Sequence, residues 1–234
     1  MHDRGKKVGI LQSNYIPWKG YFDLIARVDR FVFYDDVQYT RGDWRNRNKI
    51  KTPDGTLWLT IPCGSDIQRR ICDVRLERHG WQEKHWKNIE QYYRRAKYFH
   101  QYRDFFREIY LGNHWTNLSD FNQTVIKRIS RKILGVKTIF EDSRKYPSRG
   151  KKLRRLLGIL DQIGDVSEYV SGPSAKAYLD EKKFVERKIK LTYMSYLDYP
   201  EYRQLYGTFR HDVSIIDLLF NEGPQAARFM KHVQ

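Results

Sequence analysis

The sequence predicts an α/β fold: a Rossmann-like parallel sheet interrupted by a β-hairpin and a helical insertion. Two observations carry this prediction. A strand, a loop, a helix and a second strand follow one another between residues 8 and 34, and a β/α alternation returns after residue 136. Strands that alternate with helices in this way form parallel sheets with right-handed crossovers.

The first unit begins with a short apolar run, residues 8–12, which is typical of a buried strand. Residues 20–28 carry apolar side chains on one side, which predicts an amphipathic helix. The run 31–34 predicts the second strand. Because parallel strands end at the same edge, the residues after both strands are expected together where open α/β sheets bind ligands.

The middle of the chain has a different pattern. Residues 47–51 and 56–61 predict a hairpin, joined by a Pro-Asp-Gly turn at 53–55. From Gly80 onward, apolar stripes at helical spacing predict helices. We interpret residues 40–115, approximately, as an insertion between the two halves of the sheet.

The alternation in the second half completes the predicted sheet. Strands are expected at 136–140, 168–171 and 189–194, a helix at 150–163 and a late helix around 217–220. Ser174 and Ser214 are predicted helix N-caps. The whole chain, residues 1–234, is therefore predicted to be a single domain.

The composition narrows the class of partner. Lys and Arg number 44 against 28 Asp and Glu, a net charge of +16, which attracts nucleic acid, membrane surfaces or phosphorylated small molecules. The apolar runs are shorter than the ~20 residues of a membrane-spanning helix, and the first is too short for a secretory signal. We therefore expect a cytoplasmic protein without a membrane span.

No metal site is predicted. Cys63 and Cys72 do not form a Cys-x-x-Cys pair, and the histidines show no metal-binding spacing. His85 is a catalytic candidate, although its place on an apolar helical stripe equally fits a buried structural histidine.

The loop after the first strand is the strongest binding candidate. Gly20 at a helix start would let a phosphate approach backbone N–H groups. Asn14 could donate a hydrogen bond, and Tyr15 and Trp18 could stack on a ring. The alternative is structural, with Pro17 and Trp18 merely fixing the start of the helix.

Asp35 and Asp36 follow the second strand and are the other catalytic candidates, with Gln38 beside them as a binding residue. A carboxylate there could bind a hydroxyl or an amine, or act as a base. Adjacent residues of a strand point to opposite sides, so at most one acid faces a pocket. The alternative is that one of them caps the following turn.

Residues 44–51 alternate cations and amides. An extended segment would place Arg45, Arg47 and Lys49 on one face, with Asn48 on the other, and the cations could grip a diphosphate. The same row, with Trp44 as a stacking platform, would suit a single-stranded nucleic acid. It would also suit an edge strand protected by positive charge.

Two later segments add binding candidates. Ser171 and Gly172 end a predicted strand, and Lys176 would lie in the first turn of the next helix, where the dipole disfavours a cation. A lysine there indicates an anion, unless it is simply a surface residue. Near the C-terminus, Tyr202 and Gln204 are the ligand candidates.

Together these stretches resemble the WbqC-like protein family. The matching blocks are 12–22 (QSNYIPWKGYF), 35–39 (DDVQY), 45–50 (RNRNKI), 58–62 (WLTIP), 169–172 (YVSG) with 176–180 (KAYLD), and 199–202 (YPEY) with 214–221 (SIIDLLFN). The match spans nearly the whole chain. One position departs from it, because many members have histidine before the glutamine where this chain has Leu11.

The resemblance implies a function. Members occur among bacterial surface-polysaccharide (O-antigen) genes, and the activity suggested for some is attachment of glycine or another amino-acid-derived acyl group to a sugar. It therefore implies an acyl or aminoacyl transferase, or an amide-forming ligase, acting on an amino sugar or nucleotide-sugar. Either Asp35 or Asp36 would orient the amine. The pocket would be lined by Gln12, Asn14, Tyr15, Trp18 and Tyr21, with phosphates held by Arg45 and Arg47 and a second anion by Lys176.

The first unit also resembles, more distantly, the HUP class of nucleotidyltransferases, which carry a histidine-glycine-histidine signature at this junction. Aligning Gly20 with the signature glycine puts Trp18 and Tyr21 at the histidine positions, and neither can do histidine's proton or phosphate work. The cofactor is left open between ATP with Mg²⁺ and an acyl-CoA donor. The alternatives are a nucleotidyltransferase and a non-catalytic nucleic-acid-binding protein.

Overall fold

The computed structural model describes residues 5–76 and 80–233, and it confirms the predicted α/β class. The central sheet has the order β5-β2-β1-β6-β7 with every neighbouring pair parallel. Its strands are β1 (Lys6–Leu11), β2 (Arg30–Phe33), β5 (Ile139–Asp142), β6 (Val166–Ser171) and β7 (Lys190–Tyr193). The helices are α1 (Lys19–Arg27), α2 (Trp81–Tyr93), α3 (Phe99–Leu111), α4 (Leu118–Arg128), α5 (Lys152–Ile163), α6 (Glu181–Val185) and α7 (Ile215–Glu222).

The strand order reverses at β1. The chain runs from β1 through β2 to β5 on one side, and then crosses to form β6 and β7 on the other side. In open α/β sheets such a reversal leaves a crevice outside the carboxyl ends of the two central strands. Gln12 follows β1 and Gly172 follows β6, so both lie at this reversal.

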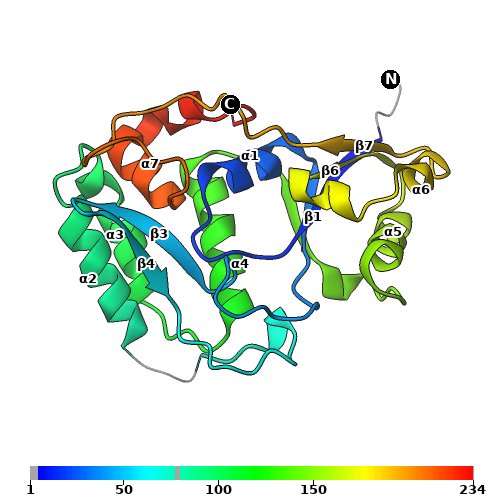
Figure 1. The fold of residues 1–234 in the computed structure, drawn as a ribbon, viewed down its shortest axis with the longest axis horizontal. Coiled ribbons are helices and arrows are strands. Elements are labelled where there is room, and N and C mark those ends of the chain that lie inside the picture. The colour runs from blue at the N-terminus through cyan, green and yellow to red at the C-terminus, as the bar shows by residue number, and fades with distance from the viewer. Residues whose placement is uncertain (1–4, 77–79, 234) are drawn as a thin grey trace.

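Helices cover both faces of the sheet, because successive side chains of a strand point to opposite sides. Val8, Ile10 and Val32 share a buried cluster with apolar side chains of α5 and α6. Phe31 and Phe33 belong to a second cluster, with side chains of α1, α4 and α7. Figure 1 shows α5 and α6 at one end of the molecule and the hairpin with α2 and α3 at the other.

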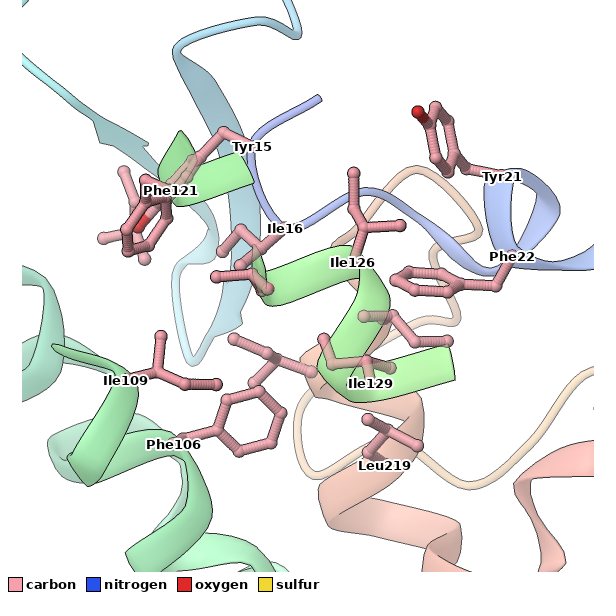
Figure 2. Close-up of a cluster of buried hydrophobic side chains, with 14 of the residues drawn as sticks. Tyr15, Ile16, Tyr21, Phe22, Phe106, Ile109, Phe121, Ile126, Ile129 and Leu219 are labelled. Atoms are coloured by element: carbon pink, nitrogen blue, oxygen red, sulfur yellow. The ribbon is translucent and has the colours of Figure 1, made fainter. Parts of the chain in front are cut away.

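The segment between β2 and β5 holds the predicted hairpin and helices. Strands β3 (Arg47–Thr52) and β4 (Gly55–Thr60) pair antiparallel around a tight turn, where Gly55 has φ +114°, a conformation that favours glycine. Helix α4 runs through the middle of the larger cluster, with Phe106 of α3 and Leu219 of α7 beside it (Figure 2). The single domain with an insertion at about 40–115 stays a prediction.

Some element boundaries differ from the prediction. The strand expected from residue 136 begins at Ile139, because the Thr138 hydroxyl donates to the carbonyls of Ile25 and Val28 at the end of α1. Ser214 does cap α7, and accepts a hydrogen bond from the Ile216 N–H. Ser174 caps nothing: Pro173, whose φ suits a first helical position, starts a 3₁₀ turn directly after Gly172.

None of the helices in the described part of the chain combines the length and the apolar character needed to cross a membrane.

Candidate functional site

A cavity of about 600 Å³ opens at the carboxyl edge of the sheet. We call it the edge cavity. Its lining residues are Gln12, Tyr34, Asp36, Val37, Gln38, Gly150, Lys151, Lys152, Arg155 and Tyr178. They come from the ends of β1 and β2, the start of α5 and the segment after β6, which is the place where open α/β sheets bind ligands.

The two adjacent acids point to different surroundings, as the strand geometry requires. Asp35 is fully buried and accepts hydrogen bonds from the Ser13 N–H (2.8 Å), the Ser119 hydroxyl (2.5 Å) and the Gln123 amide (3.2 Å). Burial raises the pKa of this carboxyl, and these donors oppose the rise. Asp35 thus joins the loop after β1 to α4, and only Asp36 faces the edge cavity.

Asp36 is held in place from two sides. Its Oδ1 accepts a hydrogen bond from the Ser143 hydroxyl at 2.6 Å, and its Oδ2 pairs with the Arg155 guanidinium. Arg155 also lies over the Tyr34 ring, 5.5 Å from its centroid. A carboxylate oxygen can accept more than one hydrogen bond, so Asp36 keeps acceptor capacity toward the cavity.

The cavity also presents free positive charge. Lys151 and Lys152 make no ion pair with any residue that the structure describes, although both line the cavity at the N-terminus of α5. The N-terminus of a helix adds a partial positive charge. This wall of the edge cavity is therefore suited to phosphate groups.

A second, smaller pocket of about 250 Å³ is lined by residues from the β1–α1 loop, the hairpin and the segment before α7. We call it the tryptophan pocket. Its lining residues are Asn14, Pro17, Trp18, Trp44, Asn48, His211 and Asp212. Three of the predicted binding residues therefore meet here rather than at the edge cavity.

The loop between β1 and α1 is held in an unusual conformation. Ile16, a β-branched residue, has φ +33°, in a region that such residues seldom adopt. The Asn48 amide from β3 holds the kink by donating to the carbonyls of Tyr15 (3.1 Å) and Ile16 (2.8 Å). Strained backbone of this kind persists where surrounding contacts over-determine it, and is concentrated at functional sites.

Gly20 has a different role from the predicted one. A Cβ at this position would overlap the indole of Trp18, so the glycine lets Trp18 pack against the first turn of α1. Tyr21 is buried, and its hydroxyl donates to the carbonyl of Gln12 at 2.9 Å. Both residues therefore stabilise the conformation of the loop through contacts within the protein.

Tyr15 and His85 lie in the core and line neither cavity. The Tyr15 hydroxyl is 2.7 Å from His85 Nδ1 and 2.6 Å from the Tyr110 hydroxyl, and its ring packs against Phe121 (Figure 2). Burial lowers the pKa of His85 to about 4, so the ring is neutral at pH 7. The arrangement is that of a satisfied core histidine which anchors the loop through Tyr15.

Tyr202 and Gln204 also point into the protein. Their hydroxyl and amide each donate to Oδ1 of the buried Asp217 at 2.8 Å, and the Tyr93 hydroxyl donates to Oδ2 at 2.8 Å. This cluster joins α2, α7 and the segment between β7 and α7.

The remaining predicted residues lie around the two cavities without lining them. Arg45 donates to Oδ1 of Asn14 at 2.5 Å. Arg47 lies 4.3 Å from the Trp58 ring centroid, and Lys176 lies 5.3 Å from that of Tyr193. Ser171 is buried where β6 ends, and Gly172 precedes the 3₁₀ turn.

Sequence reasoning missed the cations of the edge cavity. Lys151, Lys152 and Arg155 stand out only as basic pairs, and the chain carries many of those. The usable signal is position: Gly150 and two lysines open the helix that follows a predicted strand, a context similar to the one that singled out the loop after β1.

Among residues 5–76 and 80–233, no group of three His, Cys, Asp or Glu side chains is placed to hold a metal ion. Both cysteines of this part of the chain are free and buried.

Comparison with known proteins agrees with the motif resemblance. The model of the WbqC-like protein family matches residues 12–229. The uncharacterized protein Rv1507c of Mycobacterium tuberculosis is 43% identical over 229 residues, which cover 97% of this chain and 98% of the relative. No solved structure matches the chain. Because the family match includes both cavities and nearly the full length, this chain belongs to the WbqC-like protein family.

Proposed function

We propose that the protein is an enzyme that transfers an acyl or aminoacyl group to the amine of a phosphorylated amino sugar, such as a nucleotide-sugar. The role suggested for the family in surface-polysaccharide synthesis supports this substrate class. The cytoplasm is the proposed compartment, because it would supply the nucleotide-linked sugar.

The observation that carries the proposal is the edge cavity. It combines a fixed carboxylate and two tyrosines with two lysines at a helix N-terminus that pair with no acid in the described part of the chain, and it lies at the switch point of a parallel sheet. The lysines would bind phosphate groups, and Tyr178, which is 56% exposed, offers a ring surface for a base or a sugar.

Asp36 is the proposed orienting group for the amine. Amide formation joins the amine nitrogen to the acyl carbon, breaks the bond between that carbon and its leaving group, and releases one proton from nitrogen. Asp36 would accept a hydrogen bond from the amine and hold its lone pair toward the donor. Asp35 is fully buried and would hold the loop and strand in register.

Two acyl donors fit the proposal: an acyl-CoA, or an acid activated with ATP and Mg²⁺. With a thioester donor, the carbon–sulfur bond breaks and the departing thiolate takes up the released proton. The cavity is large enough for phosphate groups from either source, since ligand pockets of about 300–1,000 Å³ accommodate drug-sized molecules.

The nucleic-acid alternative has less support. Of the predicted cationic row, Arg45 donates to Oδ1 of Asn14 at 2.5 Å, and Arg47 lies over the Trp58 ring, 4.3 Å from its centroid. Lys49 is in addition paired with Asp212 at 2.6 Å. The cations of this row are therefore engaged within the protein, which leaves them less able to neutralise the phosphates of a nucleic acid.

The test is ligand binding with UDP, GDP, UDP-glucose and GDP-mannose, measured by thermal shift and calorimetry on the wild type and on Lys151→Ala/Lys152→Ala. A ligand of the native state at a hundred times its Kd stabilises by about 2.7 kcal/mol. We expect at least one nucleotide to stabilise the wild type, and the double variant to bind it tenfold or more weakly.

Lys84→Ala/Lys87→Ala is the matched control, since it removes the same charge from the exposed surface of α2. If both double variants weaken binding equally, general charge attraction explains it and the edge cavity is not the site. Turnover is then tested by mass spectrometry with amine-bearing nucleotide-sugars and acyl-CoA donors. The absence of any acylated product with every donor, ATP included, would overturn the transferase proposal.

A further inference from the structure

The tryptophan pocket combines apolar and polar walls in a space the size of one ring. Its volume of about 250 Å³ falls below the range of about 300–1,000 Å³ that holds drug-sized ligands. Trp18, Trp44 and Pro17 form the apolar side, and Trp44 is 43% exposed. Trp44 therefore presents part of its indole to solvent at this pocket.

The polar side has a defined hydrogen-bonding character. Arg45 can only donate, so its 2.5 Å hydrogen bond fixes Oδ1 of Asn14 as the acceptor and turns the two N–H groups of the amide away from the guanidinium. The Asn48 amide is occupied by the loop carbonyls. Asn14 is therefore the oriented amide donor of this pocket.

The charged groups beside the pocket pair with one another. The Asp212 carboxylate is paired with Lys49 at 2.6 Å and with Arg210 at 2.9 Å, and these cations hold the pKa of its carboxyl far below the usual range. It stays an acceptor but has no net charge left to attract a cation. Burial and the Lys19 ammonium lower the pKa of His211, so this ring is neutral at pH 7.

These features select among ligand classes. A cationic ligand would be repelled by Arg45, Lys49 and Arg210, which lie beside the lining residues, and an anionic one would have to compete with the Asp212 carboxylate for Lys49 and Arg210. A purely apolar ring would leave the Asn14 amide without a partner, which costs free energy. A neutral ring with a polar edge and an apolar face satisfies both walls.

We propose that the tryptophan pocket is a subsite for a single pyranose ring. The C–H face of the sugar packs on the electron-rich faces of Trp18 and Trp44. One hydroxyl of its edge accepts from the Asn14 amide, and another donates to the Asp212 carboxylate. The inference rests on the proposed function only where it takes this sugar to be a substrate. Binding of the sugar at the pocket can be measured without any turnover.

The loop between β1 and α1 contributes lining residues to both cavities. Gln12 lines the edge cavity, and Asn14, Pro17 and Trp18 of the same loop line the tryptophan pocket. The sugar would therefore sit on the opposite side of this short loop from the phosphate-binding lysines.

The probes are the methyl glycosides of glucose, glucosamine and N-acetylglucosamine, with cyclohexanol as the apolar ring. Binding is followed by saturation-transfer NMR and tryptophan fluorescence. We expect the wild type to bind at least one glycoside in preference to cyclohexanol, Trp44→Ala to weaken it tenfold or more, and Trp44→Phe to restore part of the loss.

Trp58→Ala is the matched control. Trp58 is 39% exposed and lies next to Trp44 on the hairpin, but it does not line the pocket. We expect this variant to bind the glycoside within twofold of the wild type. Equal losses in Trp44→Ala and Trp58→Ala would overturn the subsite, as would preference for cyclohexanol or no glycoside binding at all.

UDP binding separates this inference from the proposed function. Trp44→Ala should bind UDP as the wild type does, and Lys151→Ala/Lys152→Ala should bind the glycoside as the wild type does. Glycoside binding without UDP binding would support the sugar subsite and overturn the phosphate site. UDP binding without glycoside binding would support the phosphate site and overturn the sugar subsite.

Discussion

At the scale of single residues, burial decides which polar side chains can act on a ligand. Asp35 and Asp36 are neighbours with the same chemistry, yet one is enclosed by Ser13, Ser119 and Gln123 while the other faces a cavity. Burial raises the pKa of Asp35 although these three donors oppose the rise, so the stability contributed by its protonated form is lost as pH rises through its folded-state value. Its retained role is to bridge β1, β2 and α4.

His85 provides a test of burial at this scale. Its pKa of about 4 in the folded protein, lowered by burial, lies below the unfolded value of 6.5. The unfolded chain therefore takes up a proton first as pH falls. The stability that comes from a neutral His85 is complete above about pH 6.5 and is lost as pH falls toward 4.

We predict that His85→Phe is less stable than the wild type at pH 7.5 by about 1 kcal/mol, because the Tyr15 hydroxyl loses one of its two partners. Between pH 7.5 and 5 the stability difference should move in favour of the variant by about 2 kcal/mol, since only the wild type loses the histidine contribution. Urea unfolding at the two pH values measures it. A difference that does not change with pH would show that His85 can be protonated in the fold.

At the scale of elements, the start of α1 is shaped by one close contact. Substituting alanine for glycine within a helix usually stabilises it by about 1 kcal/mol. At Gly20 the added methyl group meets the Trp18 indole, which has Tyr196 and Tyr199 on its other sides at 4.9 and 5.9 Å between ring centroids. The two tyrosines limit its retreat on their side, and a shift the other way would carry the indole into the tryptophan pocket.

We predict that Gly20→Ala destabilises the protein by about 1–3 kcal/mol, the usual cost of overpacking. Because Trp18 lines the tryptophan pocket, glycoside binding should weaken as well, while UDP binding is unchanged. Ala26→Gly on the same helix is the control: it costs about 1 kcal/mol through backbone entropy and should leave glycoside binding intact. Normal glycoside binding by Gly20→Ala would mean that Trp18 is not needed in its present position.

At the scale of the whole molecule, buried polar clusters join parts that are distant in the chain. Asp217 of α7 accepts from Tyr93 of α2, and the same Tyr93 hydroxyl accepts from the Lys51 N–H of the hairpin at 2.9 Å. Tyr202 and Gln204 complete the cluster from the segment before α7. Burial raises the pKa of Asp217, and the donors around it limit the rise.

We predict that Tyr202→Phe destabilises the protein by about 1.5–3 kcal/mol at pH 7, since it removes a hydrogen bond to a buried charged group. Removing a donor raises the pKa of Asp217 further, so the cost should grow as pH rises from 5 to 7. Denaturant unfolding at both pH values measures this, and binding of UDP and glycosides should be unaffected.

Tyr206→Phe is the comparison for that cluster. The Tyr206 hydroxyl donates to the neutral carbonyl of Tyr92 at 2.8 Å, so its loss should cost only about 1 kcal/mol and show no such pH dependence. Loss of ligand binding in Tyr202→Phe, with stability unchanged, would instead return Tyr202 to the set of ligand-binding residues.

Local sequence patterns predict the α/β class, the strands and helices of the first unit, the hairpin and the position of the loop after β1. These follow from local periodicity and turn chemistry, which depend on residues close together in the chain. They also predict that at most one of Asp35 and Asp36 faces a pocket, because neighbouring residues of a strand point to opposite faces. The family followed from the same motifs, and the family match confirms it.

Which side chains come into contact depends on the tertiary fold, and local patterns do not predict it. Lys151 and Arg155 join Asp36 across more than a hundred residues of chain, and Tyr202 turns away from the cavities toward Asp217. Local sequence patterns do not predict such long-range contacts. A buried acid is found beside hydrogen-bond donors, because an unpaired charge in the core costs roughly several kcal/mol. Packing therefore assigned the polar residues either to the core or to the two cavities.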